Sequence, residues 1–272
     1  AFAEVPDKRM DFLVEHYKPK KVSPAKIEFV DTIPLSNGAG QNQENVKFLD
    51  EIRKVDALIH IIGVFNGETP AIKALDIVNS ELLLSDLFLV EKRIESMEKS
   101  KKKESLDKQE LSFLKKCQET LEKEMPLSSI NFSDSELKFV RNYSFLSAKP
   151  QILILNLGEE DFKNNTWPSK EEIIKECQKT NINYLSLSCL LEKEISELDS
   201  QDQQMFMEDL GITEPVINVL TKTAYDTLGL ISFFTVGTDE VKAWTITTGT
   251  NAKKAAGKIH SDIERGFIRA EV

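Results

Sequence analysis

The spacing of apolar residues along this chain predicts alternating strands and helices over its first two thirds. Near-continuous apolar runs occupy residues 55–65 and 150–155. Runs of this kind are typical of strands that are buried on both faces of a sheet. Further strands are expected at residues 26–31 and 183–189, with helical segments between them. The repeat of strand, loop and helix from about residue 1 to 195 indicates an α/β fold whose parallel sheet carries helices on both faces.

A different pattern interrupts this repeat between residue 76 and about residue 123. Apolar residues recur there at alternating steps of four and three, which is a heptad seam formed by Leu83, Leu87, Val90, Ile94 and Met97. A second amphipathic helix is expected after a polar turn. Two such helices joined by a short turn form an antiparallel hairpin. The turn carries Lys101 to Lys103. These lysines either contact RNA phosphates or simply belong to a turn exposed to solvent.

Local signals mark where several helices begin and where the pattern changes again. Ser133 with Glu136 and Ser169 with Glu172 each have the spacing of a capping box. A further helix is expected over residues 10–17. Beyond Gly229, two alternating segments joined by four residues predict a β-hairpin. A helix and a strand starting at Gly266 follow, which is the opening of a small ubiquitin-like fold.

Composition narrows the class of protein. The 272 residues suffice for more than one compact unit, and the formal charge of -10 argues against binding nucleic acid by bulk charge. The three cysteines are far apart and lack metal-ligand spacing, as expected in a reducing compartment. No apolar run reaches the ~18 residues needed to span a bilayer. The sequence therefore predicts a cytoplasmic, monomeric protein without a membrane partner.

Polar residues at the ends of predicted strands are the candidates for chemistry. Asn156 and Glu159 directly follow the apolar run at 150–155, where open α/β sheets bind their ligands. An amide there can meet a purine edge, and a carboxylate can accept from a base N–H; a polar loop after a buried strand is equally the ordinary outcome. Asp31 ends another predicted strand, as a functional residue or as a turn former. His60 lies inside an apolar run and is interpreted as a core histidine.

The carboxyl-terminal segment FFTVGTDEVKAWTITTGTNAKKAAGKIHSDIERGFIRAEV resembles the start of the TGS domain of the Obg-like ATPases, the YchF family. Three earlier segments resemble other parts of the same family. VPDKRMDFL with KPKKVSPAKIEFVDT and FLDEIRKVDALIH are similar to its nucleotide-binding domain, and ELLLSDLFLVEKRI is similar to its inserted helical hairpin. The resemblance covers nearly the whole chain.

The resemblance implies a Ras-like, translation-associated P-loop NTPase that binds ATP in preference to GTP, with Mg²⁺, and associates with ribosomes. Asn156, Leu157 and Glu159 match the family's Asn-x-x-Glu, which replaces the guanine-reading Asn-Lys-x-Asp of GTPases. Ser188 and Cys189 match the small residues that back the base. Asp31 matches the aspartate near Mg²⁺ and the γ-phosphate, and Leu35 matches the apolar residue that takes the place of a catalytic glutamine.

Two departures from the family pattern bear on hydrolysis. No G-x-x-x-x-G-K-[ST] occurs in the sequence, and we expect an amino-terminal segment carrying that loop to precede residue 1. The family's Asp-x-Ala-Gly-Leu is here Asp31-Thr32-Ile33-Pro34-Leu35, and proline lacks the backbone N–H that glycine gives to the γ-phosphate. These departures point to weak hydrolysis.

The sequence thus predicts three domains. The nucleotide-binding domain would comprise residues 1–77 and 146–228, the inserted hairpin residues 78–145, and a truncated TGS domain residues 229–272. The expected function is nucleotide binding with slow hydrolysis, coupled to ribosome or translation-factor binding. The alternative is a hydrolysis-defective pseudo-NTPase that acts as a ribosome-associated interaction module.

Overall fold

A computed structural model describes residues 1–32, 43–65, 70–99 and 105–271. The chain divides into two compact units: unit 1 comprises Ala1–Val30 with Leu191–Val272, and unit 2 comprises Asp31–Leu190. Residues 1–30 and 191–228, which the sequence analysis assigns to the nucleotide-binding domain, therefore belong to the same unit as the carboxyl-terminal residues. No helix among the described residues has both the length and the apolar character to cross a membrane.

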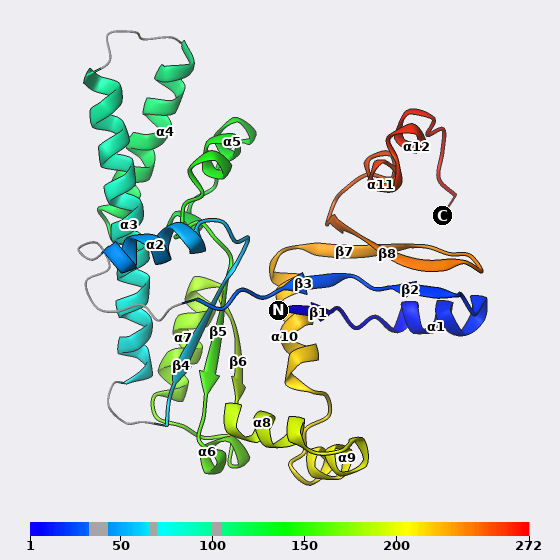
Figure 1. The fold of residues 1–272 in the computed structure, drawn as a ribbon. Coiled ribbons are helices and arrows are strands. Elements are labelled where there is room, and N and C mark those ends of the chain that lie inside the picture. Colours follow the sequence, from blue (N-terminus) through cyan, green and yellow to red (C-terminus); the bar gives the residue numbers. More distant parts are fainter. Residues whose placement is uncertain (33–42, 66–69, 100–104, 272) are drawn as a thin grey trace. The chain divides into compact units, whose positions relative to one another are not determined.

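Unit 2 is built around a three-stranded parallel sheet in the order β4-β5-β6 (Figure 1). Its strands are β4 (Leu58–Gly63), β5 (Gln151–Asn156) and β6 (Asn183–Leu187). Its helices are α2 (Gln43–Ile52), α3 (Ala71–Lys99), α4 (Ser105–Leu121), α5 (Asp134–Tyr143), α6 (Glu159–Lys163) and α7 (Lys170–Thr180), with the 3-10 helix η1 (Leu127–Ser129). The register pairs Leu58 with Gln151 and Ile152 with Asn183, so all three strands end at one edge.

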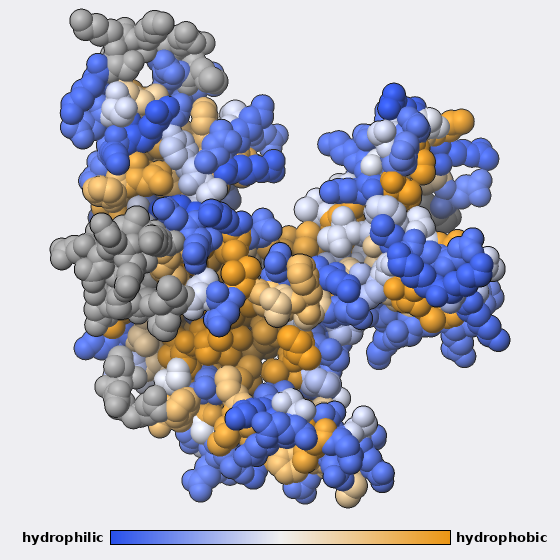
Figure 2. All heavy atoms as spheres, viewed as in Figure 1, coloured by the Kyte–Doolittle hydropathy of each residue, from blue (hydrophilic) through white to orange (hydrophobic). Residues whose placement is uncertain are grey.

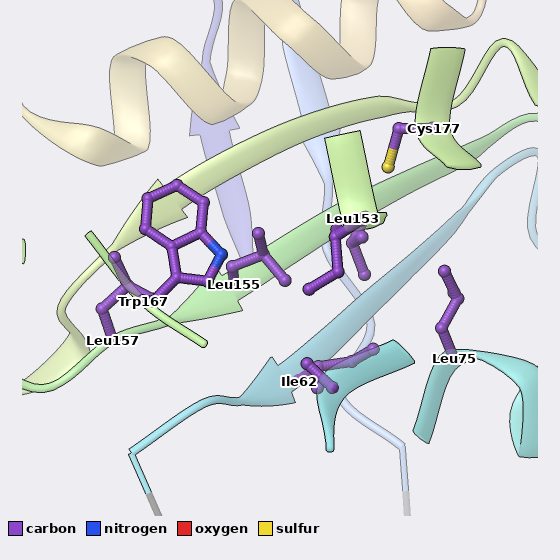
Figure 3. Packing of buried hydrophobic residues seen from close by; sticks show 9 residues of the cluster. Ile62, Leu75, Leu153, Leu155, Leu157, Trp167 and Cys177 are labelled. Carbon is purple, nitrogen blue, oxygen red and sulfur yellow. The ribbon is translucent and has the colours of Figure 1, made fainter. Parts of the chain in front are cut away.

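One face of this sheet packs against α3 and α7 in a hydrophobic cluster (Figure 3). Leu153 and Leu155 of β5 lie between Leu75 of α3 and Cys177 of α7. Trp167 closes the end of the cluster, and its buried Nε1 finds no hydrogen-bond partner among the described residues. Burial raises the pKa of the Cys177 thiol, so this cysteine is a core residue rather than a reactive thiol.

The strand expected at residues 55–65 is shorter than predicted and is not buried on both faces. It begins at Leu58, and Ile61 on its second face is 64% exposed. The reason is position, because β4 stands at the edge of the sheet, whereas β5 lies between two strands and its residues 152–155 are all buried. The apolar run therefore correctly predicted a strand, but it did not predict the position of that strand in the sheet.

The heptad seam packs as its spacing predicts. Helices α3 and α4 lie side by side (Figure 1). All five seam residues belong to one cluster with Phe113 and Cys117 of α4 and with Leu127 and Phe145. Burial raises the pKa of the Cys117 thiol to about 12, which leaves it protonated and inert. Lys101 to Lys103 lie outside the described residues.

The two predicted capping boxes have different outcomes. Ser133 accepts from the backbone N–H of Glu136, and the Glu136 carboxylate accepts from the Ser133 N–H, so α5 has a capping box. Ser169 instead has a φ of 59° and makes no side-chain cap to α7, which corrects that prediction. A cap requires extended backbone at the capping residue, and the turn after Trp167 places Ser169 in the left-handed region.

Unit 1 contains two small sheets. Strands β1 (Phe2–Glu4) and β3 (Lys26–Glu28) form an antiparallel ribbon, and β2 (Lys21–Ser23), β8 (Glu240–Thr247) and β7 (Leu230–Thr235) form a sheet in that order. Its helices are α1 (Lys8–Tyr17), α9 (Ser200–Asp209), α10 (Val216–Thr227), α11 (Ala252–Ile259) and α12 (Ser261–Arg265), while α8 (Cys189–Glu197) begins at the border with unit 2. The predicted β-hairpin forms as β7 and β8.

In unit 1, one strand prediction is confirmed only in part and another is wrong. The segment 26–31 ends as a strand at Glu28 and pairs with β1, not with the parallel sheet, because Ala25 and Ile27 pack with Val5 and Tyr225 in a separate core. Residues 266–271 form no strand, and Ile268 is 93% exposed. A strand is stabilised by ladder hydrogen bonds to a neighbour, and no described strand pairs with this segment.

A buried carboxylate joins three parts of unit 2. Asp86 of α3 is fully buried. Its oxygens accept from Arg53 Nη1 at 2.9 Å and from the backbone N–H groups of Leu146 and Ser147 at 3.0 and 2.8 Å. The carboxylate thereby links α3 to the residue after α2 and to the turn before β5.

We expect Asp86→Ala to lower the free energy of unfolding of unit 2 by about 3–5 kcal/mol, because it removes the carboxylate that pairs with the Arg53 charge and leaves two buried N–H groups without their acceptor. The measurement is urea unfolding followed by circular dichroism. Glu91→Ala, at an exposed position of the same helix, is the control and should change little. Equal effects of the two substitutions would contradict this role for Asp86.

The partly buried His60 makes stability depend on pH. Burial lowers the pKa of His60 to about 4, so the side chain is neutral at pH 7. In the unfolded chain the His60 side chain binds a proton near pH 6.5, whereas in the folded chain it stays neutral at that pH. The free energy of unfolding therefore falls as the pH drops. Between pH 7 and pH 5 this loss should be about 2 kcal/mol. His60→Gln should remove that share of the pH dependence in urea unfolding, and an unchanged slope would show that His60 is accessible to protons.

Candidate functional site

Three parallel strands deliver polar residues to one edge of unit 2. The β4–β5 ladder continues past the strand ends through a hydrogen bond from Val64 N to Asn156 O at 2.9 Å. On the other side, Leu157 N donates to Leu187 O at 2.8 Å. We call the residues at this edge, Phe65 with residues 156–159 and 188–189, the carboxyl-edge site.

Asn156 fixes the two loops of this site to each other. Its Oδ1 accepts from the backbone N–H of Cys189 at 2.9 Å. Cys189 is the first residue of α8, where backbone N–H groups have no partner within the helix. This bond therefore supplies the helix start with an acceptor from β5 and leaves the Asn156 NH₂ group as a donor. The pairing of residues 156 and 189, which lie 33 positions apart in the sequence, places both predicted loops together.

Ser188 supplies a polar atom with no partner. The residue is 2% exposed, and its Oγ finds no hydrogen bond among the described residues. A buried hydroxyl without a partner costs about 1–3 kcal/mol. Such a cost is tolerated where a ligand completes the bonding.

Leu157 does not have the orientation that a base-contacting residue needs. Its side chain is 2% exposed and lies in the cluster of Leu155 and Trp167 (Figure 3). Replacing it with lysine, the residue of the guanine-reading motif, would therefore bury a charge in an apolar core. Leu157 is a core residue beneath the site.

Glu159 begins the short helix α6, and Gly158 stands at its N-cap. The Glu159 carboxylate accepts from Lys163 Nζ at 2.6 Å, one turn along the helix. The side chain is 46% exposed, so the ion pair is open to solvent and to a ligand. The structure thus brings Asn156, Glu159, Ser188 and Cys189 to one edge, as the sequence predicts.

Phe65 is a component that the sequence analysis missed. It follows the end of β4 and is 52% exposed. A Cβ built on Gly158 would lie 3.6 Å from Phe65 Cβ, so the ring belongs to the same edge as residues 156–159. The signal was present in the sequence as an aromatic residue just beyond a strand, but the apolar run at 55–65 read as buried throughout.

The structure does not place Asp31 at this edge. Asp31 is exposed and outside any helix or strand, and no hydrogen bond in the described part of the chain joins it to the carboxyl-edge site. Leu35 and Pro34 lie outside the described residues. Among the residues that the structure describes, no three metal-ligating side chains gather.

Comparison with known proteins gives the family. The family model YchF-GTPase_C, described as "Protein of unknown function (DUF933)", matches residues 230–272. The "Ribosome-binding ATPase YchF" of Bacillus subtilis is 37% identical over 282 residues, covering 98% of this chain and 76% of the relative. "Obg-like ATPase 1" of Caenorhabditis elegans is 33% identical over 284 residues, covering 98% and 71%.

A solved structure agrees with these sequence matches. "Structure of the Schizosaccharomyces pombe YchF GTPase" superposes with a TM-score of 0.85 at 30% identity, covering 98% of this chain and 75% of that one. The fold is therefore an α/β fold with a parallel sheet of the kind found in that protein. The chain belongs to the YchF family of Obg-like ATPases.

The Asn156 bond can be tested without any ligand. Asn156→Ala removes the acceptor for the Cys189 N–H and should free the start of α8 to open. We expect amide hydrogen exchange at Cys189 to become about tenfold faster, the equivalent of losing one hydrogen bond of about 1.4 kcal/mol. Exchange at Ile154, inside β5, should stay unchanged. Equal acceleration at both amides would indicate general unfolding instead.

Proposed function

We propose that this chain binds a nucleoside triphosphate at the carboxyl-edge site, with adenine accepted at least as readily as guanine. The observation that carries the proposal is the hydrogen bond from Cys189 N to Asn156 Oδ1, because it builds one site from the two loops that the family resemblance assigns to the base. Membership in a family whose relatives are called ATPases supports the same ligand class.

The site offers each kind of contact that a purine base needs. The Asn156 NH₂ group can donate to a ring nitrogen, and Ser188 Oγ gains its missing partner when a base or its bridging water binds. The exposed Phe65 ring offers a stacking surface. Glu159 replaces the aspartate that reads the guanine N1–H and N2–H₂ donors, and its carboxylate is already paired with Lys163. With these contacts, we do not expect the site to select strictly for guanine over adenine.

Phosphate and metal binding involve other parts of the protein. The 272 residues contain no G-x-x-x-x-G-K-[ST], so the carboxyl-edge site accounts for base recognition only. Mg²⁺ commonly binds through the nucleotide phosphates, water and one or two carboxylates, and it neutralises charge on those phosphates. Asp31 is the residue we assign to the surroundings of the metal, on the family resemblance. Because phosphates and water supply most of its ligands, Mg²⁺ bound in this way does not require a cluster of three protein side chains.

Membership in the family supports a proposal for the reaction and for the partner. Slow hydrolysis coupled to ribosome binding is the leading proposal, supported by relatives that are called ribosome-binding ATPases, which also supports a cytoplasmic location. Pro34 in place of glycine supports the alternative, a pseudo-NTPase that acts as an interaction module. The hairpin of α3 and α4, assigned to residues 78–145, is the element we propose for ribosome contact, and residues 229–272 are assigned to a TGS domain on their resemblance.

We expect ATP to shift the amide resonances of residues 157–159 and 188–190 at concentrations equal to or below those that GTP requires. Two-dimensional NMR titration of the chain reads out even weak binding. Phe65→Ala should weaken ATP binding by about 5–150-fold, since stacking of one base on an aromatic ring is worth about 1–3 kcal/mol.

The matched control is Phe12→Ala, which removes another exposed phenylalanine from α1 in unit 1 and should leave binding unchanged. Tighter binding of GTP than of ATP would contradict the base preference. Shifts confined to residues outside the carboxyl-edge site would contradict the site itself. A hydrolysis assay then separates the enzyme from the pseudo-NTPase, because both bind nucleotide but only the first releases phosphate.

A further inference from the structure

A lysine already engages the Glu159 carboxylate of the carboxyl-edge site. One carboxylate oxygen, Oε1, accepts from Lys163 Nζ at 2.6 Å. The two residues lie four positions apart on α6, a spacing that brings side chains together on one side of a helix. Both side chains are nearly half exposed, so the pair stands where a ligand can reach it. Lys163 therefore lies at the site, although no sequence pattern singled it out.

Helix α6 is anchored from its inner side. The ring of Phe162 packs against the cluster that contains Leu157 and Trp167. The Phe162 backbone N–H donates to the Gly158 carbonyl oxygen at 2.9 Å, which closes the first turn of the helix. Glu159 and Lys163 thus extend from a helix that the core holds in place, and their ion pair keeps a fixed position beside the base contacts.

The other polar groups of the site mainly offer donors. Asn156 Oδ1 is committed to the backbone N–H of Cys189, so the amide presents its NH₂ group to a base. The buried Ser188 hydroxyl can donate or accept. A lysine ammonium has donors only. With Oε1 held by Lys163, the second oxygen of Glu159 is the strongest acceptor that remains among these groups.

Guanine and adenine need different numbers of acceptors. The N1–H and N2–H₂ groups of guanine lie side by side, and a carboxylate receives them best when both of its oxygens are available, as in other bidentate pairs. Adenine carries a ring acceptor and one amine at the corresponding edge, so a site rich in donors suits it. The ligand that loses most from an occupied carboxylate oxygen is therefore guanine.

We propose that Lys163 sets the base preference of the carboxyl-edge site by holding one oxygen of Glu159. An exposed ion pair is weak in water. A bound base displaces water from the site, and the attraction between the two charges strengthens as the effective dielectric constant falls. Guanine must then break the pair or give up one of its two hydrogen bonds to the carboxylate, whereas adenine needs to do neither. Lys163 is a positioning residue that acts through Glu159.

This role rests on the proposed nucleotide function. The test compares ATP, GTP and inosine triphosphate in two-dimensional NMR titrations of the whole chain, with dissociation constants taken from the shifts of residues 157–159 and 188–190. The first variant is Lys163→Met, which removes the ammonium group and keeps an unbranched side chain of similar helix propensity. The triphosphate is common to the three ligands, so a lost positive charge acts on it equally and cancels in the affinity ratios.

We expect Lys163→Met to raise the affinity for GTP relative to ATP by about threefold to tenfold, the contribution of one further hydrogen bond. Inosine triphosphate should gain less than GTP, because its base has the N1–H without the 2-amino group. In a Glu159→Gln background, Lys163→Met should change the GTP-to-ATP ratio by less than about twofold, since the carboxylate through which Lys163 acts is gone.

The matched control is Lys179→Met on α7, which removes an exposed lysine that pairs with Glu176 in the same unit. It makes the same change in net charge and should leave the ratio unaltered. Equal changes from Lys163→Met and Lys179→Met would overturn the proposal, because bulk charge would then explain them. An equal change with Glu159 or with Gln at position 159 would overturn it as well, because Lys163 would then act independently of the carboxylate.

The same titrations separate this role from the nucleotide site itself. An unchanged GTP-to-ATP ratio in Lys163→Met, with shifts still present at the carboxyl-edge site, would overturn the role of Lys163 and leave the site standing. Absence of shifts at that site with all three nucleotides would overturn the site, and the role of Lys163 with it.

Discussion

The arrangement of unit 2 depends on one buried carboxylate. Asp86 is a charged group with no access to water, and it is retained because four donors surround it: Arg53, two backbone N–H groups and the Ser147 hydroxyl. Removing a charge from water is costly unless such partners are in place. The donors come from segments 33 and about 60 residues away, so the carboxylate is satisfied only when α3, the end of α2 and the turn at 146–147 meet.

This constraint reaches the carboxyl-edge site through β5. The turn that Asp86 holds leads directly into β5, whose six residues end at Asn156. A strand of this length spans about 20 Å, and its central position in the sheet leaves it no freedom to slide without exposing the core residues Leu153 and Leu155. Fixing one end of β5 therefore fixes where Asn156 presents its amide to Cys189. The proposed base contacts are therefore preorganised by packing and not by the loops themselves.

The charged residues of this chain are not distributed evenly between the two units. The carboxyl-edge site combines an amide, a hydroxyl, an aromatic ring and a neutralised carboxylate, which suits a planar polar base. The net charge of -10 is not spread evenly, since one 28-residue stretch of unit 1 carries no basic residue at all.

The sequence by itself determined those features that depend on neighbouring residues. The heptad seam from Leu83 to Met97, the capping box at Ser133, the β-hairpin after Gly229 and the polar ends of β5 and β6 follow from spacing and residue type, because their interactions lie within one or two turns or strands. Only the tertiary structure decided the rest. It placed β4 at an edge with Ile61 exposed, turned Leu157 into the core, set Ser169 in the left-handed region and paired β3 with β1. Each outcome depends on which distant segment supplies a neighbour, and a pattern of apolar positions records that a residue can be buried, not what will bury it.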